Sequence, residues 1–430
     1  MFMCTVHQPN GRLRAASAFL ASVLLFLVVI CGLCPFAATA EEGTGSIALW
    51  TGRTKAWSQA MSGQVCCPAG DASLPVALTG VSARGAVLIE AESGDVVFGQ
   101  NEHARLPMAS TTKIMTALVA LEALPLDTEI RIPAEAVGVE GSSIYLVEGE
   151  VLTAEQLLYA LLLESANDAA AAIAIAVGGS VEGFAKRMNQ KALDLGLTDT
   201  QFANPHGLDA EGHYTTAYEL AVIARAALAN EIFRTICATE RKTIPLHSGE
   251  GVRLLLNHNK LLDSYEGCIG VKTGFTKKTG RCLVSAAERD GVTLIAVTLN
   301  APDDWRDHTA MLNYGFDLYR SVPLCEAGFY SAPLWVVSGA QEYVMVENTQ
   351  ALSVVLPRAH GEIRCVVELP RFEFAPIAGG AQVGVLRFFE VTPGGGTAEL
   401  GYVPLYAVYG CDPADHTLSL WERILGFFGR

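Results

Sequence analysis

Hydrophobic and polar positions alternate through residues 85–101, GAVLIEAESGDVVFGQN, on both sides of a Ser93-Gly94 pair. A period of two is typical of β-strands, and a glycine turn between two such runs predicts a hairpin. The next run, at 114–124, reads IMTALVALEAL and is almost continuously apolar. This run predicts a buried helix that begins near Ser110.

Further helices are predicted between residues 153 and 230. Thr153 followed by Gln156 forms the pattern of a capping box, which opens a helix. Gly178-Gly179 and Gly196 are helix-stop signals behind the next two periodic runs. The predicted helices cover residues 157–163, 169–177, 181–196 and 216–230.

The pattern changes beyond residue 254. Residues 267–300 read as three antiparallel strands in a meander, with turns at 277–280 and 289–291. Helical periodicity resumes over 307–322. Helices packed against an antiparallel sheet indicate an α+β domain over residues 76–320.

Residues 321–410 consist of short alternating runs punctuated by Gly and Pro, which predicts an all-β, sandwich-like domain. Residues 41–75 mix polar and small side chains without a sustained period, so we expect a loose leader there. A length of 430 residues suits two or three domains of roughly 100–200 residues each.

The first 40 residues are predicted to be a secretory signal peptide. Arg12 and Arg14 precede a long apolar stretch that ends in the small residues Ala38-Thr39-Ala40. The alternative is an uncleaved signal anchor, because the apolar stretch is long for a signal peptide. Either interpretation predicts export of the remaining chain.

The last residues, 411–430, predict an amphipathic helix. One half of the helical circumference carries apolar side chains and the other half carries polar ones. The apolar set is Leu418, Leu420, Trp421, Ile424, Leu425, Phe427 and Phe428. We expect residues 412–430 to bind a membrane surface, since the segment is too short and too polar to span a bilayer. The alternative is a helix docked on the β-domain.

The composition of the chain limits the classes of binding partner and the roles of its cysteines. The formal charge of −15 argues against nucleic acid, because phosphate binding needs basic surface. Eight of the eleven cysteines follow the predicted signal peptide, and these eight are scattered and form no CxxC pair or zinc-type spacing. Most are therefore predicted to be small buried side chains. Cys66-Cys67 is the candidate exception, because export permits disulfides.

Candidate chemistry begins at Ser110-Thr111-Thr112-Lys113. Residues three apart share a helix face, so the Lys113 ammonium is predicted to lie over the Ser110 hydroxyl. A lysine whose pKa is lowered by burial can activate a serine nucleophile. Taken alone, SxxK describes an ordinary helix cap far more often than a catalytic site.

Two polar motifs later in the chain make a catalytic site more plausible than a helix cap. Ser165-Ala166-Asn167 sits at a predicted break between helices, where a loop can project polar side chains into a cleft. In Lys272-Thr273-Gly274, a cation and a hydroxyl suit a carboxylate, and Gly274 lets a ligand approach the backbone. Taken singly, these clusters indicate only a turn and an edge strand.

SxxK, SxN and KTG in this order and spacing match the penicillin-recognising serine enzymes. The sequence resembles the serine-type D-Ala-D-Ala carboxypeptidases, the low-molecular-weight penicillin-binding proteins, over residues 76–430. The resemblance implies a transpeptidase-like α+β domain, removal of the terminal D-alanine from peptidoglycan stem peptides, inhibition by β-lactams, and no cofactor. The matching segments are AVLIEAESGDVVFGQN, MASTTKIMTALVALE, LLYALLLESANDAA, FANPHGLDAEGHYTTAYELA and GVKTGFTKKTGRCLVSA.

The resemblance implies roles for the acyl-transfer residues. Ser110 would be the nucleophile and Lys113 its general base. Ser165 would relay a proton to the leaving D-alanine. The backbone N–H groups of Ser110 and Phe275 would form the oxyanion hole.

It also implies a set of substrate-binding residues. Asn167 would hold the substrate backbone. Lys272 would supply positive charge, Thr273 would bind the terminal carboxylate, and Gly274 would admit the ligand. Family members often have glycine at the position of Ala166, and we expect little effect of this difference on the chemistry.

Three alternatives accompany this interpretation. The first is a β-lactamase of the same fold, which would need neither the β-domain nor the tail. The sequence also lacks the ExxLN loop that supplies a deacylating glutamate in class A β-lactamases. A non-catalytic peptidoglycan-binding scaffold would need degenerate motifs, and all three motifs are intact. His206 and His213 invite a metal site, but two ligands at that spacing fit no common one. The favoured hypothesis is an exported enzyme on the outer face of a bacterial cytoplasmic membrane.

Overall fold

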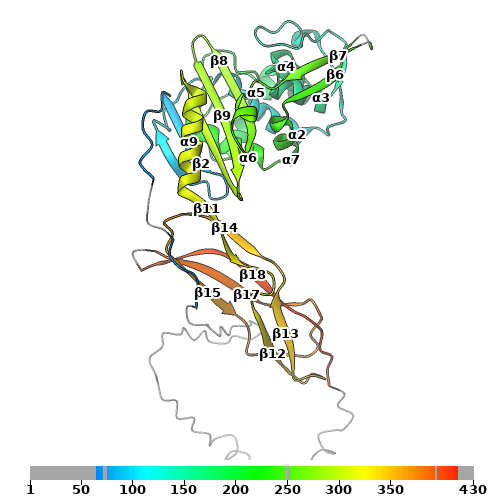
Figure 1. Ribbon diagram of the computed structural model, residues 1–430. Helices are drawn as coiled ribbons and strands as arrows, with labels where there is room; N and C mark the ends of the chain where they lie inside the picture. Colours follow the sequence, from blue (N-terminus) through cyan, green and yellow to red (C-terminus); the bar gives the residue numbers. More distant parts are fainter. Residues whose placement is uncertain (1–63, 71–74, 248, 250, 393–394, 415–430) are drawn as a thin grey trace, which may run out of the picture. The chain divides into compact units, whose positions relative to one another are not determined.

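The computed structural model describes residues 64–70, 75–247, 249, 251–392 and 395–414 (Figure 1). The predicted signal peptide, most of the predicted leader and residues 415–430 of the predicted tail lie outside this part of the chain. Among the described residues, no single helix has the length and hydropathy to cross a bilayer. The pair α4 (Asn167–Gly178) and α5 (Val181–Asp194) would together pass that criterion, but the two helices meet at 81°.

A five-stranded antiparallel sheet is the centre of the first domain, in the order β3-β2-β10-β9-β8. The predicted hairpin is β2 and β3, which turns at Gly94 (φ 84°), and the predicted meander is β8, β9 and β10. The strands are β2 (Gly85–Glu90), β3 (Val96–Gln100), β8 (Cys268–Thr276), β9 (Gly280–Arg289) and β10 (Val292–Leu299).

Both faces of this sheet are covered, as alternation along β2 demonstrates. Ala86 and Leu88 belong to the cluster that contains Met311 of α9 (Asp304–Leu318). Val87 and Ile89 belong to the cluster formed with the other helices. Since successive side chains of a strand point to opposite faces, α9 and the helical group lie on opposite sides of the sheet. Antiparallel pairing with helices confirms the predicted α+β class.

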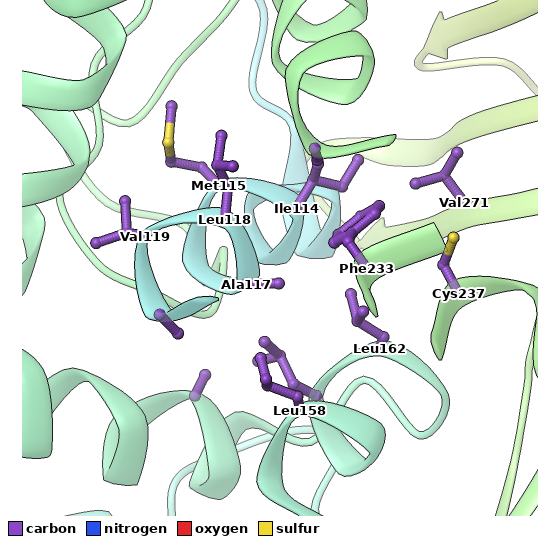
Figure 2. Packing of buried hydrophobic residues seen from close by; sticks show 14 of the residues in the cluster. Ile114, Met115, Ala117, Leu118, Val119, Leu158, Leu162, Phe233, Cys237 and Val271 are labelled. Atoms are coloured by element: carbon purple, nitrogen blue, oxygen red, sulfur yellow. The ribbon is translucent and has the colours of Figure 1, made fainter. Parts of the chain in front are cut away.

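The helical group surrounds α2, which directly follows the short 3-10 helix η1. Residues 113–120 of α2 are all buried. Figure 2 shows Ile114 and Leu118 of α2 among Leu158, Phe233 and Val271, which come from α3, α7 and β8. The bounds are η1 (Ala109–Thr112), α2 (Lys113–Ala123), α3 (Ala154–Leu162), α4 (Asn167–Gly178), α5 (Val181–Asp194), α6 (Ala217–Leu228), α7 (Glu231–Ala238) and α8 (Leu261–Ser264).

The predicted helices are present with small shifts of their ends, except that residues 319–322 of the helix predicted over 307–322 begin strand β11 (Tyr319–Cys325). The capping box is made in both directions: Thr153 Oγ1 accepts from Gln156 N at 3.2 Å, and Gln156 Oε1 accepts from Thr153 N at 2.9 Å. Helix α7, which is only eight residues long, and two hairpins with strands of three to five residues were not predicted from the sequence. The hairpins pair β4 (Glu129–Arg131) with β5 (Val151–Thr153) and β6 (Arg241–Pro245) with β7 (Val252–Leu256).

The second domain is all-β, as predicted. A seven-stranded sheet has the order β1-β15-β17-β18-β13-β12-β16, and β11 pairs with β14 in a second sheet. Val322 and Val354 of the small sheet share one hydrophobic cluster with Leu334 and Leu386 of the large sheet, which gives a sandwich-like core. The strands are β11 (Tyr319–Cys325), β12 (Ser331–Val337), β13 (Tyr343–Asn348), β14 (Leu352–Pro357), β15 (Glu362–Glu368), β16 (Phe372–Phe374), β17 (Gln382–Val391) and β18 (Thr397–Ala407).

The prediction of a loose leader is wrong for its described residues 64–67. Gln64–Cys67 forms strand β1, which pairs antiparallel with β15 through Gln64 and Cys365. Four residues are too few to carry a periodic signal, and the pairing partner lies in a distant part of the sequence. Cys66 and Cys67 pack against the β-domain cluster, so they belong to that domain's core margin.

Candidate active site

The three sequence motifs meet at one cavity of about 340 Å³. Ser110, Ser165, Thr273 and Gly274 line it. They come from η1, from the connection between α3 and α4, and from β8. A larger cavity of about 560 Å³ beside Arg225 contains none of these residues.

Ser110 and Lys113 are brought together by the 3-10 turn. In a 3-10 turn, residues three apart lie directly above one another. Lys113 Nζ is 2.9 Å from Ser110 Oγ, as the SxxK spacing predicts. The preceding residue, Ala109, has φ 47°, a left-handed conformation that costs a non-glycine residue about 1–2 kcal/mol. This strain sits next to the predicted nucleophile.

Lys113 is fully buried and held by three oxygen atoms. Its Nζ lies 2.9 Å from Ser110 Oγ, 2.7 Å from Asn167 Oδ1 and 2.6 Å from the His206 carbonyl oxygen. Burial, and then the nearby charge of Lys272, lower the pKa of Lys113 well below its usual value. A neutral amine has two N–H donors and one lone pair.

These contacts suit the neutral form. The two N–H groups are matched by Asn167 Oδ1 and the His206 carbonyl, neither of which can donate a proton. The lone pair is then left to face the Ser110 hydroxyl. The arrangement therefore places a base on the serine proton.

Ser165 and Asn167 occupy the start of α4. Ser165 is 5% exposed, has φ 60°, and faces the same cavity as Ser110. The Asn167 amide accepts from Lys113 and donates to the Glu140 carbonyl oxygen at 2.5 Å. Asn167 thus fixes Lys113 in this structure, and its predicted contact with a substrate backbone stays a prediction.

Lys272 and Thr273 are presented by β8. Lys272 is 1% exposed, and its Nζ donates to the Thr273 carbonyl oxygen at 3.0 Å. Burial lowers the pKa of Lys272 to about 7, and the carboxylate of Glu164 opposes this shift. Thr273 is half-buried and lines the cavity. The strand therefore supplies a hydroxyl beside a buried, titratable cation.

Two glycines allow the turn η1 to be enclosed. A Cβ atom at Gly274 would lie 3.0 Å from Ser110 N and 3.1 Å from Thr111 N. A Cβ atom at Gly207 (φ 89°) would lie 1.9 Å from the Ala109 carbonyl oxygen. The backbones of β8 and of the 203–213 loop consequently touch the turn directly, which leaves no room for side chains there.

The two histidines of that loop bond within it and to η1. His213 Nδ1 accepts from Ala203 N at 3.0 Å, so its Nε2–H donates to Thr112 Oγ1 at 2.8 Å. Burial, more than the opposing effect of Asp209, lowers the pKa of His213 to about 4. The His206 carbonyl binds Lys113. Both residues therefore position the SxxK turn.

Several polar residues that also line the cavity were not predicted from the sequence. His258 Nε2 lies 3.4 Å from Glu164 Oε2, and Arg281 Nη2 lies 3.0 Å from Asp304 Oδ1. Arg281 follows from the predicted hairpin, because a turn at 277–280 places it opposite Phe275. No sequence pattern singles out His258, which sits in the loop after β7.

Comparison with known proteins agrees with the motifs. Residues 72–303 match the profile of the D-alanyl-D-alanine carboxypeptidases, peptidase family S11. The chain is 33% identical over 314 residues to the D-alanyl-D-alanine carboxypeptidase DacF of Bacillus subtilis, which covers 71% of this chain and 80% of DacF. It is 37% identical over 240 residues to DacB2 of Mycobacterium tuberculosis, covering 54% of this chain and 81% of DacB2.

Solved structures give the same assignment. The carboxypeptidase DacD of Francisella tularensis superposes with a TM-score of 0.55 at 28% identity, covering 80% of this chain and 97% of DacD. The Streptomyces K15 DD-transpeptidase superposes with a TM-score of 0.54 at 35% identity, covering 56% of this chain and all of that enzyme.

Proposed function

Because this chain belongs to the S11 family of D-alanyl-D-alanine carboxypeptidases, we propose that it removes the terminal D-alanine of peptidoglycan stem peptides through an acyl-enzyme on Ser110. The observation that carries the mechanism is the 2.9 Å contact between Lys113 Nζ and Ser110 Oγ at a cavity shared with Ser165 and Thr273. An activated hydroxyl, a proton path and a carboxylate-binding group are what acyl transfer to serine requires.

In the acylation step, Ser110 Oγ attacks the carbonyl carbon of the penultimate D-alanine and Lys113 accepts the hydroxyl proton. The oxyanion is stabilised by the N–H groups of Ser110 and Phe275, which Gly274 allows to approach. As the C–N bond breaks, Ser165 relays the proton from Lys113 to the departing amine, which leaves Lys113 neutral again. Water, activated by Lys113, then hydrolyses the ester and restores the Ser110 hydroxyl.

The substrate carboxylate binds Thr273 beside the charge of Lys272. A hydroxyl next to a cation is a suitable partner for the free C-terminal carboxylate of a stem peptide. A β-lactam carries a carboxylate and an acyl carbon in a comparable arrangement, so it acylates the same serine and inhibits the enzyme. Asn167 holds Lys113 and completes the site.

The enzyme is exported and works on the outer face of the cytoplasmic membrane, held there by residues 412–430. The predicted signal peptide at 1–40 and the amphipathic pattern of the tail support this placement. Deletion of residues 412–430 is expected to release the protein from membranes. Retention after deletion would favour an uncleaved N-terminal anchor.

Two measurements test the catalytic proposal. Mass spectrometry after benzylpenicillin treatment should find one adduct on Ser110, and Ser110→Ala should abolish it. Purified protein should release D-alanine from a diacyl-D-Ala-D-Ala peptide. An adduct on another residue would overturn the site assignment. An adduct that turns over within seconds would favour the β-lactamase alternative, and absence of D-alanine release would favour a non-catalytic scaffold.

A further inference from the structure

The outer face of the seven-stranded sheet carries a row of apolar side chains. Leu334 and Val336 of β12 point into the core, so Trp335 and Val337 between and after them point outward. Trp335 is paired with Tyr343 of β13 on one side and with Phe372 of β16 on the other. Three adjacent strands therefore present aromatic rings at the same level.

These side chains are well exposed. The rings of Trp335 and Tyr343 are 5.9 Å apart, and those of Phe372 and Phe374 are 5.7 Å apart. We call the set the aromatic face. Its exposed fractions are 53% for Trp335, 42% for Tyr343, 47% for Phe372, 59% for Phe374 and 40% for Val337. A contiguous exposed apolar patch of this kind marks an interaction site.

The described chain ends at the margin of the aromatic face. Gly339 forms a β-bridge with Pro413, and Ala414 N donates to the Ser338 carbonyl oxygen at 2.9 Å. Ser338 directly follows Val337, the last residue of β12. The 16 residues that continue the chain, 415–430, contain the whole apolar half of the predicted amphipathic tail. The aromatic face and the tail are thus joined at one edge of the domain.

We propose that the aromatic face is a second membrane-binding surface that rests in the lipid–water interface next to the tail. This inference deepens the membrane attachment proposed above and rests on it. Trp and Tyr favour the headgroup level of a bilayer, because each combines an apolar ring with a polar group that stays hydrated. Once the tail binds, the aromatic face is held at high effective concentration near the same surface, so the two contacts reinforce each other.

The test is flotation of the exported chain, beginning at Glu41, with vesicles of phosphatidylcholine and phosphatidylglycerol. In the face variant, Trp335→Ser, Phe372→Ser and Phe374→Ser are combined. We expect this variant to bind about tenfold more weakly or worse, since each ring loses apolar area that the lipid would bury. The matched control is Val252→Ser with Leu254→Ser, an exposed apolar pair (61% and 56%) on β7. The control should bind like the wild type.

Release of D-alanine from a soluble peptide should be equal in the wild type, the face variant and the control. This readout separates failure of the membrane contact from failure of the proposed enzyme. Deletion of residues 415–430 should weaken flotation further and leave binding of a hydrophobic dye unchanged.

Four results would overturn the proposal. The first is unchanged vesicle binding by the face variant, and the second is equal loss of binding by the control. The third is a rise in dye binding after the tail is deleted, because the tail would then be the occupant of the aromatic face. The fourth is a wild-type dimer that the face variant converts to a monomer, because a second copy would then be the occupant.

Discussion

The depressed pKa of Lys272 leads to a prediction about the pH dependence of acylation. Lys272 is almost completely buried, and its pKa is lowered from about 10.5 to about 7. A shift of this size corresponds to about 5 kcal/mol in favour of the neutral form, at 1.36 kcal/mol per pKa unit. In the proposed mechanism, substrate and β-lactam carboxylates need the charged form of Lys272, because a neutral amine offers much weaker attraction.

Acylation should therefore follow a bell-shaped pH profile. Lys113 must be neutral to act as the proposed base, so the rate falls at low pH as pH drops below its strongly lowered pKa. Lys272 must be protonated, so the rate also falls as pH rises through about 7. The assay is the second-order rate constant for acylation by a fluorescent penicillin, measured from pH 5 to 10.

Two substitutions identify the group responsible for the alkaline limb. Lys272→Arg keeps a charge that does not titrate in this range, so the decline above pH 7 should vanish. Lys272→Gln cannot titrate either and should give a slow rate that stays flat above pH 7. Persistence of a limb near pH 7 in either variant, with the fold intact by circular dichroism, would refute the assignment of that limb to Lys272.

Three further outcomes follow from the structure. Lys272 titrates near 7 when folded and near 10.5 when unfolded, so the unfolded state binds more protons between these values. Each pH unit in that window should add about 1.4 kcal/mol to the free energy of unfolding of the wild type relative to Lys272→Met. Urea denaturation at pH 7.5, 8.5 and 9.5 measures this difference. Equal slopes of unfolding free energy against pH in the two proteins would contradict it. Gly274→Ala places a methyl group about 3.0 Å from Ser110 N. This methyl group should displace η1 and lower the acylation rate about 100-fold. An acylation rate within threefold of wild type would be incompatible with this packing. Thr153→Ala removes one hydrogen bond of the capping box and should lower the free energy of unfolding, measured in urea, by about 1 kcal/mol. The control is Thr235→Ala on the exposed side of α7.

Local patterns predicted much of the fold. Short apolar runs separated by glycine-containing turns located the β2–β3 hairpin and the β8–β10 meander, because these signals depend only on neighbouring residues, although both faces of the sheet are buried. The capping box at Thr153 located the start of α3, since its two hydrogen bonds depend only on neighbouring residues. What the sequence could not provide was long-range pairing, which is why β1 was missed.

The candidate site likewise has some features that the sequence could predict and others that it could not. The three-residue offset of Ser110 and Lys113 is a local geometric property and could be read directly. The contacts of Lys113 with Asn167 and the His206 carbonyl join three distant segments, and no spacing rule reveals them. The role of His206 is invisible for a further reason: it acts through its backbone, which any residue type can supply.

Strand β1 has a consequence for the order in which the chain folds. Its partner Cys365 is made about 300 residues later, and closing so large a loop is entropically slow. The catalytic domain lies between the two in sequence, so it can complete its own core before β1 finds β15. Until then the outer edge of β15 is open to pairing with another chain. Four residues near the beginning of the described chain therefore act as a closing strand that protects the finished sheet from self-association.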